Sequence, residues 1–372
     1  MKFSFNQASM AKSLQRIMGA VPTRMPMQSL GNIHFKLKDQ ALEMTATDLE
    51  ITVTTKVEVI ESEGDGSILI QAKRFNDIIR ELPEVILEID VQEPFKVTLK
   101  GEGMGVYTLP GGDPMDFPEL PPIDSQLSFS LSGDCLKRVI SKTSFAVSHD
   151  EMRPILTGVL MQIRPDELRV VATDGHRLSR IVKRGIDYTG ESRDIVIPMK
   201  AFSLLMRNLE DADNPIIGIA ETRASFKTDD LRLTTRLIEG HYPKYENVIP
   251  ENNPNKLTIN TDDMISTIKR VSIFANQISH QVKLTVAADS VLLETEDPDL
   301  GGRGEEKILA NFEGAPLEIA YNSNYLMDVL KQVETDEFVF ALNTSNDAAV
   351  FQGTTVDGAE DFLILLMPIR LK

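Results

Sequence analysis

Short runs of alternating apolar and polar residues are interspersed along the chain with segments whose apolar residues recur every three or four positions. The first third holds alternating runs at residues 33–37, 51–57, 85–89 and 96–99, separated by turn-forming residues. Alternation with a period of two predicts strands with one wet face, and the longer spacing predicts amphipathic helices. We therefore expect an α+β protein whose antiparallel sheets are covered by helices on one side.

This strand-to-helix pattern occurs three times at near-equal intervals. The repeated apolar positions are Phe3, Phe5, Met10 and Leu14, then Phe129, Leu131, Leu136 and Ile140, then Leu257, Ile259, Met264 and Ile268. An Ala-Thr-Asp segment at residues 46–48 returns at 172–174, and the aromatic-proline step at 117–118 returns at 242–243. The interval far exceeds the roughly 20–50 residues of a solenoid repeat, so each copy is predicted to be a whole domain.

Proline-rich and polar segments at residues 118–125 and 250–255 are typical of domain boundaries. We predict three domains, at residues 1–122, 128–250 and 256–372. Each should hold two helices and roughly seven or eight strands.

The composition excludes several classes of protein. The single cysteine, Cys135, excludes an internal disulfide framework and a zinc site built from several cysteines. The chain enters a strand pattern at its first residues, and no apolar run approaches the roughly 18 residues of a membrane span. We expect a soluble, cytoplasmic protein with no membrane partner.

Charge is unevenly distributed. The net charge of −17 argues at first against a polyanionic partner. The predicted helices, beginning with residues 8–24, nevertheless carry a net positive charge, and the acidic excess lies elsewhere. Either these helices face a polyanion, or Lys and Arg occur there because both are good helix formers.

Domain size favours a ring of two chains. A domain of about 125 residues has a diameter of about 35 Å, so six such domains in a hexagon enclose a hole of about the same width. Three domains would leave almost no gap. We predict a homodimer in which basic helices face a duplex and acidic sheets face outward.

Several segments then resemble one family. Residues 172–178 (ATDGHRL), 240–243 (GHYP), 248–250 (VIP) and 366–371 (LMPIRL), with the length and the threefold repeat, resemble the bacterial DNA polymerase III β subunit, the replicative sliding clamp. The resemblance covers the whole chain. It implies a head-to-tail dimer closed around double-stranded DNA, held by sequence-independent phosphate contacts. It also implies a non-catalytic accessory subunit of a DNA-directed DNA polymerase, without a cofactor or metal.

The resemblance further implies partners and a peptide-binding pocket between the second and third domains. The expected partners are the DNA polymerase III α subunit, the clamp loader, and other polymerases and repair proteins. The pocket residues would be Arg153, Leu156, Thr173, Gly175, His176, Arg177, Leu178, Pro243, Asn247, Val248, Asn322, Tyr325, Leu366, Met367, Pro368, Ile369 and Arg370. Their apolar members could take Leu or Phe anchors, and the polar ones could hold the peptide backbone. The chain departs from many relatives at Asn247 and at residues 154–155.

Two further sets of residues belong to this hypothesis. The expected phosphate contacts are Arg24, Lys137, Lys142, Lys200, Arg207 and Lys269. At the subunit contact, a predicted edge strand with Met104 and Val106 would meet Ile273 and Phe274 of the second chain. Basic residues would face acidic ones beside it: Lys73 and Arg74 opposite Asp297, Glu305 and Glu306.

Two other classes of function remain open. One is a three-domain peptide-binding scaffold that never encircles DNA. The other is an enzyme in which Asp174 orients His176, although the motif offers no nucleophile or metal partner. The glycine-rich segments 101–105 and 301–304 are predicted hairpins, because neither opens a helix as a phosphate-binding loop does. The acidic residues near 297–306 lack the spacing of a calcium loop.

Overall fold

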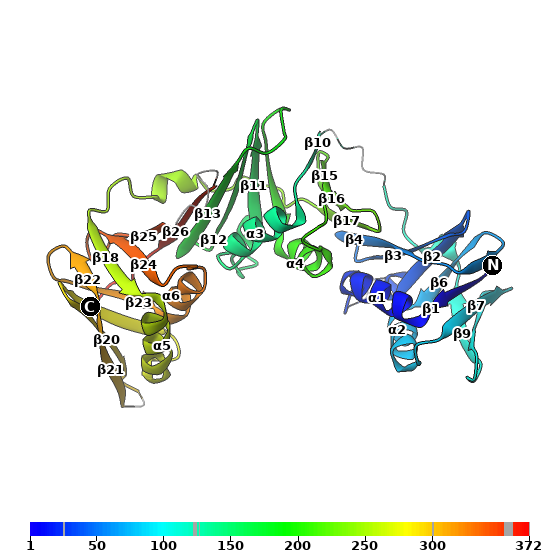
Figure 1. The fold of residues 1–372 in the computed structure, drawn as a ribbon, viewed down its shortest axis with the longest axis horizontal. Coiled ribbons are helices and arrows are strands. Elements are labelled where there is room, and N and C mark those ends of the chain that lie inside the picture. The colour runs from blue at the N-terminus through cyan, green and yellow to red at the C-terminus, as the bar shows by residue number, and fades with distance from the viewer. Residues whose placement is uncertain (25–26, 122–124, 126, 300, 353–359, 372) are drawn as a thin grey trace. The chain divides into compact units, whose positions relative to one another are not determined.

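The computed structural model describes residues 1–24, 27–121, 125, 127–299, 301–352 and 360–371. The chain divides into two compact units, one comprising Met1–Lys137 with Ile197–Leu237 and the other Arg138–Val196 with Ile238–Lys372. The end of the predicted first domain, Pro122, and the last residue, Lys372, lie outside the described residues. Figure 1 shows the strands and helices of each unit.

The first unit contains one long sheet. Its strand order is β10 (Leu127–Ser130), β15 (Ile216–Ile219), β16 (Arg223–Lys227), β17 (Leu231–Arg236), β4 (Ile51–Val57), β3 (Ala41–Thr47), β2 (Asn32–Lys38), β6 (Gly66–Gln71), β9 (Tyr107–Gly112), β8 (Lys96–Gly101), β7 (Ile86–Gln92), β1 (Lys2–Asn6) and β5 (Glu61–Glu63). The helices α1 (Gln7–Ile17), α2 (Ala72–Glu81) and α4 (Met199–Asn208) belong to this unit, and α3 (Gly133–Ser144) begins in it. Short 3-10 turns lie at η1 (Met18–Ala20), η2 (Gln28–Gly31) and η3 (Pro114–Asp116).

The second unit contains most of a nine-stranded sheet and a four-stranded sheet. The first has the order β14 (Arg193–Pro198), β11 (Gly158–Arg164), β12 (Glu167–Thr173), β13 (Arg177–Arg184), β26 (Glu360–Leu366), β25 (Ala349–Gln352), β24 (Glu337–Leu342), β18 (Asn255–Asn260) and β22 (Asn311–Glu313). The second has the order β21 (Gly302–Leu309), β20 (Ser290–Asp297), β19 (Gln281–Ala287) and β23 (Leu317–Asn322). Helices α5 (Thr261–Val271) and α6 (Ser323–Leu330) and turns η4 (Pro154–Thr157), η5 (Tyr245–Val248) and η6 (Ser272–Phe274) complete it.

The elements follow the apolar pattern. In β1 the buried residues are Phe3 and Phe5, and the asparagine that follows caps α1 by accepting the Ala8 N–H. Met10 and Leu14 of α1 are fully buried. The helix ends at Ile17, however, and not at Arg24 as predicted, because the chain tightens into η1 and then extends.

Antiparallel pairing joins consecutive repeats. Strand β17 pairs with β4, with Leu233 opposite Val53, and β13 pairs with β26, with Leu178 opposite Leu365. Each pairing hides two sheet edges that would otherwise expose unpaired backbone groups. The repeats therefore share sheets across the sequence boundaries between them.

The two glycine-rich segments connect or begin strands, as predicted. Residues 101–105 join β8 to β9, and residues 302–304 start β21, which pairs with β20. Met104 and Val106 were expected on an edge strand, and this was wrong, since β9 begins only at Tyr107. Pairing of β9 with both β8 and β6 places these two residues in the connection before it.

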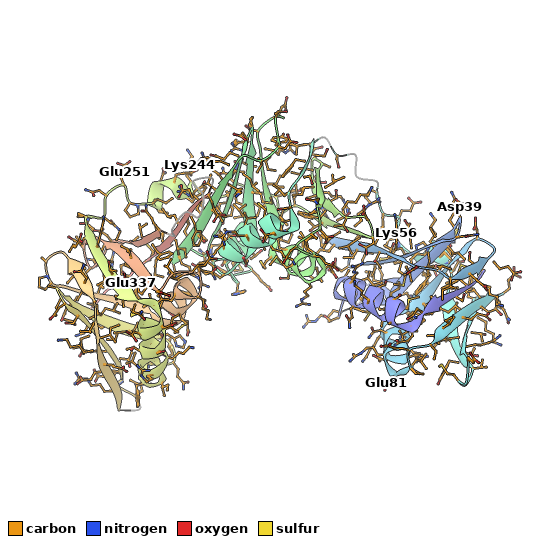
Figure 2. The ribbon with its side chains drawn as sticks, viewed as in Figure 1. Asp39, Lys56, Glu81, Lys244, Glu251 and Glu337 are labelled. Atoms are coloured by element: carbon orange, nitrogen blue, oxygen red, sulfur yellow. The ribbon has the colours of Figure 1, made fainter. Side chains whose placement is uncertain are left out.

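Charged side chains such as Lys56, Glu81 and Lys244 project away from the sheets and helices (Figure 2). Within the described residues, no helix combines the length and hydropathy needed to cross a bilayer. The same part of the chain shows no cluster of three or more His, Cys, Asp or Glu side chains suited to a metal ion.

Candidate functional site

The turn between β12 and β13 is held by its own side chains. The Thr173 hydroxyl donates to the Arg177 carbonyl at 2.7 Å and accepts the Gly175 N–H at 3.1 Å. One oxygen of Asp174 accepts the N–H groups of His176 and Arg177, at 2.8 and 2.9 Å. Gly175 has a φ of 92°, in the left-handed region that favours glycine. The motif therefore forms a stiff turn.

Arg177 connects this turn to α6. Its guanidinium is buried, donates to the free oxygen of Asp174 at 3.1 Å, and donates to Asp328 at 2.6 Å. The guanidinium carbon also lies 4.5 Å from the ring centre of Tyr325 and 5.5 Å from that of Phe145. Two carboxylates and two aromatic faces thus compensate a buried cation that would otherwise be costly.

His176 lies on the exposed side of the turn. Its ring stacks on Tyr325, with 5.9 Å between the ring centres. The Asp174 carboxylate is engaged by backbone N–H groups and by Arg177, so it does not orient the imidazole. This arrangement offers no support for the acid-base interpretation of the two residues.

The end of the chain packs beside the same turn. Leu366 pairs with Arg177 across the sheet, and the Met367 N–H donates to the His176 carbonyl at 2.8 Å. The Ile369 N–H donates to the Ala320 carbonyl of β23 at 2.7 Å. Met367 and Arg370 are exposed, while Pro368 and Ile369 are half-buried. Residues 367–369 thus bridge the turn and β23.

A second segment reaches the turn from residues 242–248. The Tyr242 hydroxyl accepts the Thr173 N–H at 3.1 Å, and burial raises the pKa of Tyr242 well above its usual range. Tyr245 donates to Gln162 at 2.7 Å, and burial raises its pKa to about 12. Both phenols therefore stay protonated and serve as fixed hydrogen-bonding groups. Pro243, Asn247 and Val248 of this segment are exposed.

The remaining predicted pocket residues surround this arrangement. Arg153 pairs with Asp150 at 2.8 Å and also reaches the Asp174 carbonyl at 3.4 Å. Asn322 caps α6 by accepting the Asn324 and Tyr325 N–H groups. Leu156, Leu178 and Leu366 are almost fully buried. The exposed apolar side chains of the predicted set are those of Pro243, Val248 and Met367.

The sequence pattern missed Asp328, Phe145 and Tyr242 as partners of the turn. Asp328 lies 151 residues from Arg177, and no local signal could have linked the two.

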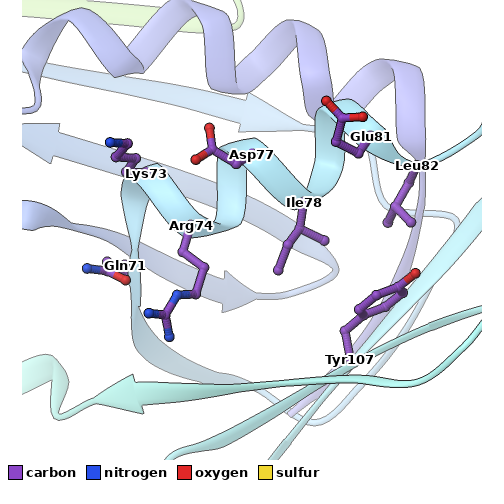
Figure 3. Close-up of a pocket in the computed structure, with 8 residues that line it drawn as sticks. All are labelled: Gln71, Lys73, Arg74, Asp77, Ile78, Glu81, Leu82 and Tyr107. Atoms are coloured by element: carbon purple, nitrogen blue, oxygen red, sulfur yellow. The ribbon is translucent and has the colours of Figure 1, made fainter.

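A second candidate surface lies between α2 and β9. It encloses a cavity of about 550 Å³. Figure 3 shows Ile78 and Leu82 of this cavity facing Tyr107. The rim carries the predicted Lys73 and Arg74, together with Gln71, Asp77 and Glu81. The sequence predicted the two basic residues at this surface but not its apolar residues, Ile78, Leu82 and Tyr107.

The predicted partner segment of this surface is also exposed. Ile273 is 77% exposed and Phe274 is 44% exposed, both in η6. The Phe274 ring lies against β21, where a Cβ at Gly304 would come within 2.8 Å of it. Strand β21 lies at the edge of its four-stranded sheet, and its residues are alternately half-buried and exposed.

The three acidic residues expected beside this segment are already engaged within the chain. Asp297 is buried and accepts the Asp299 N–H at 3.0 Å, so its predicted role at the surface is wrong. Glu306 accepts two hydrogen bonds from Arg270, which lowers the pKa of Glu306. Glu305 pairs with Arg303 at 2.7 Å, although both side chains remain exposed.

The predicted phosphate-binding residues fall into three groups. Arg207 and Lys269 are exposed on α4 and α5, and Arg24 is exposed beyond η1. Lys137 and Lys200 form ion pairs with Asp211 and Asp48. Lys142 is only 5% exposed: its ammonium donates to the Gln332 carbonyl at 2.7 Å, pairs with Glu334 at 2.8 Å and lies over Phe362. The prediction of a phosphate contact at Lys142 is therefore wrong.

Comparisons with known proteins cover the whole chain. Three models of the DNA polymerase III beta subunit match in order: the N-terminal domain at residues 1–121, the central domain at 130–244 and the C-terminal domain at 246–370. The beta sliding clamp of Escherichia coli K12 is 30% identical over 372 residues, and that of Bacillus subtilis 168 is 31% identical over 390 residues. Each alignment covers 100% of both chains.

Solved structures give the same result. A crystal structure of the DNA polymerase III subunit beta from Pseudomonas aeruginosa is 28% identical with a TM-score of 0.94. A DNA polymerase sliding clamp from Bacillus subtilis is 30% identical with a TM-score of 0.93. Both comparisons cover 100% of each chain.

Proposed function

Because this chain belongs to the DNA polymerase III beta subunit family, the beta sliding clamps, we propose that it closes around duplex DNA as a head-to-tail homodimer and tethers the replicative polymerase. The observation that carries the proposal is the succession of three clamp domains, in family order, along the full chain. We place the domains at residues 1–122, 128–250 and 256–372. Such a clamp is a non-catalytic, cytoplasmic accessory subunit without a cofactor.

Two unpaired strand edges support closure by two chains. Residues 107–110 of β9 pair with β8 on one side, and among the described residues they have no strand partner on the other. Strand β21 likewise has only β20 beside it in the described sheet. Exposed edges of this kind add strands from another chain.

Exposed apolar side chains lie next to both edges. We place Ile273 and Phe274 of one protomer in the cavity of its partner, against Ile78, Leu82 and Tyr107. The basic Lys73 and Arg74 at the rim then meet Glu305, the acidic residue of the predicted set whose carboxylate stays on the surface. Met104 and Val106 would contribute from the connection that precedes β9.

Phosphate contacts would come from basic residues on helices and turns whose side chains are exposed or half-buried. We assign this role to Arg24, Lys137, Lys200, Arg207 and Lys269, and remove Lys142 because it is buried. Contacts of this type carry no sequence information, which suits a protein that slides.

The turn at residues 173–177 and the chain end would form the docking site for partner peptides. Its exposed apolar residues, Pro243, Val248 and Met367, can contact Leu or Phe anchors, and Met adapts to varied partners. The proposed occupants are segments of the DNA polymerase III α subunit, the clamp loader, and other polymerases and repair proteins. The stiffness of the turn would hold His176 and Arg177 in place for each of them.

A topological test separates this function from that of a scaffold. The protein is loaded onto a nicked circular plasmid by a purified clamp loader and separated from free protein by gel filtration. We expect it to stay with circular DNA and to be released when a restriction enzyme linearises the plasmid, because only a ring is lost through a free end. A plasmid without the restriction site is the control. Equal retention on circular and linear DNA would contradict encirclement and favour the peptide-binding scaffold.

A further inference from the structure

The face of the first unit's sheet that points away from its helices carries an unexpected basic patch. Side chains along β4, β16 and β17 point alternately to the two faces of the sheet. Those on the helix side, such as Val53, Phe226 and Leu233, are buried. Helices α1 and α4 pack on β4 and β17. The opposite face was expected to be acidic.

A cavity of about 400 Å³ lies on this opposite face. It is lined by three cationic residues, six hydroxyl residues and a short apolar wall: Arg223, Lys227 and Arg232; Thr52, Thr54, Ser125, Ser128, Ser225 and Thr234; and Leu120, Pro121, Ile216 and Gly218. No carboxylate is among these described lining residues. In a chain with a net charge of −17, such a composition is unusual.

Strand register places like charges directly opposite each other. Lys227 faces Arg232 across the β16–β17 pair, and Arg223 faces Arg236 on the same side of the sheet. Opposed like charges destabilise a sheet. Arg236 has a carboxylate neighbour, Glu50 at 3.5 Å, whereas no ion pair joins Arg223, Lys227 or Arg232 to another residue in the described ranges. An anion placed between these cations would remove the repulsion.

Hydroxyl groups form a row beside the cations. Register aligns Ser128, Gly218, Ser225, Thr234 and Thr52 across five strands. A Cβ at Gly218 would lie 2.7 Å from the Ser225 hydroxyl oxygen, so a larger residue would block the middle of the row. Hydroxyl donors and nearby cations are the groups that bind phosphate oxygens.

The remaining wall is apolar. Ile216 is 51% exposed and Leu120 is 38% exposed, and both line the cavity. The volume is within the roughly 300–1,000 Å³ of sites for small molecules. A ligand with a charged end and a flat organic end would match both parts of the cavity.

We propose that this cavity binds a small phosphate-bearing molecule of the nucleotide class. Its phosphate lies between Lys227 and Arg232 and accepts from Ser225 and Thr234, and its organic part packs on Ile216 and Leu120. The site is separate from the clamp function and does not depend on ring closure.

Isothermal titration calorimetry of the full chain at low salt tests the proposal with four probes. These are ADP, inorganic phosphate, adenosine, and an oligothymidylate without terminal phosphates. We expect ADP to bind more tightly than inorganic phosphate, adenosine to bind at least tenfold more weakly than ADP, and added salt to weaken ADP binding. Adenosine binding as tightly as ADP would overturn the phosphate assignment, and tighter binding of the oligonucleotide would make the patch a nucleic-acid surface instead.

The double variant Lys227→Gln with Arg232→Gln locates the site. We expect its affinity for ADP to fall at least tenfold, while Lys56→Gln, an exposed lysine on the same strand face outside the cavity, leaves the affinity unchanged (Figure 2). Without ligand the double variant should melt no lower than the parent protein, because a repulsive pair has been removed. If the double variant fails to fold, Arg223→Gln must weaken ADP binding. Unchanged affinity in the folded variant would overturn the assignment.

Discussion

At the scale of single residues, Arg177 is the most tightly constrained side chain of the candidate docking site. It is a buried cation held by Asp174, Asp328 and the Tyr325 ring, so it ties the β12–β13 turn to α6. These contacts also fix the position of the exposed His176, because it precedes Arg177 in the same turn.

Removing this cation should destabilise the protein strongly. We expect Arg177→Ala to lower the free energy of unfolding by about 3–5 kcal/mol, because Asp174 and Asp328 each lose one charged partner and the Asp174 carboxylate stays buried. Arg177→Lys should cost less, since it keeps the charge and loses the planar fork. Urea denaturation measures both, with the exposed Arg370→Ala as the control. A loss below about 1 kcal/mol for Arg177→Ala would show that the ion pairs contribute little.

At the scale of elements, α3 is tied to the C-terminal part of the second unit by ion pairs. Arg138 forms paired hydrogen bonds with Glu334 and with Glu360, and Lys142 also contacts Glu334. The hydrogen bonds from Arg138 lower the pKa of Glu334 to about 2. The helix is therefore anchored by charge as well as by its apolar face.

This anchor predicts a pH dependence. The pKa of Glu334 is lower in the folded state than its usual value of 4.5, so its stabilisation is present above pH 4.5 and is lost as the pH falls toward 2. We expect Glu334→Gln to lower the melting temperature at pH 7 and the difference from the parent protein to shrink below pH 4.5. Differential scanning calorimetry measures the two melting temperatures at each pH. The control is Glu337→Gln, because Glu337 is also exposed. A difference that grows on acidification would contradict the assignment.

The chain end is the other element whose role can be tested. Deletion of residues 367–372 removes the hydrogen bonds from Met367 to His176 and from Ile369 to Ala320. We expect the truncated protein to remain dimeric and its affinity for a Gln-Leu-x-Leu-Phe type peptide to fall at least tenfold. Burying one Leu or Phe anchor contributes roughly 1.5–3 kcal/mol to binding. Losing the wall formed by residues 367–372 is therefore enough for a tenfold fall in affinity. Fluorescence anisotropy measures this, and equal affinities would place the partner site elsewhere.

At the scale of the whole molecule, the proposed ring would use one surface from each of the two compact units. One is the cavity of α2 and β9, and the other is the exposed pair Ile273 and Phe274 beside β21. The cavity has apolar residues at its base inside a polar rim, and Ile273 and Phe274 are apolar. Neither surface is covered by the described part of its own chain.

Replacing both Ile273 and Phe274 by alanine should therefore give monomers. The expected result in analytical ultracentrifugation is a species near 41.4 kDa at micromolar concentration, whereas we expect the parent protein to sediment as a dimer. Ile278→Ala is a matched control, because that residue is 90% exposed and follows the same turn. If the double variant sediments as a dimer, the subunit contact lies elsewhere.

The strands, the helices and their threefold repetition could be predicted from the sequence alone. Phe3, Phe129 and Leu257 mark three strands, each followed by an amphipathic helix, because strand and helix periods depend on neighbours a few positions away. The residues of the turn at 173–177 were likewise recognisable as a motif. Its Thr, Asp and Gly bond to backbone groups within four residues, so the local sequence is sufficient.

Which charged side chains are accessible to a partner depends on contacts between residues far apart in the chain. In the sequence, Lys142 is indistinguishable from an exposed helix lysine, but it is buried over Phe362. Asp297 likewise reads as a surface carboxylate, but it is buried. The prediction that Met104 and Val106 lie on a strand failed because the pairing of β9 with β8 determines where β9 begins. The opposition of Lys227 and Arg232 follows from strand register. Burial and register depend on residues far apart in the chain, and local periodicity carries no information about those contacts.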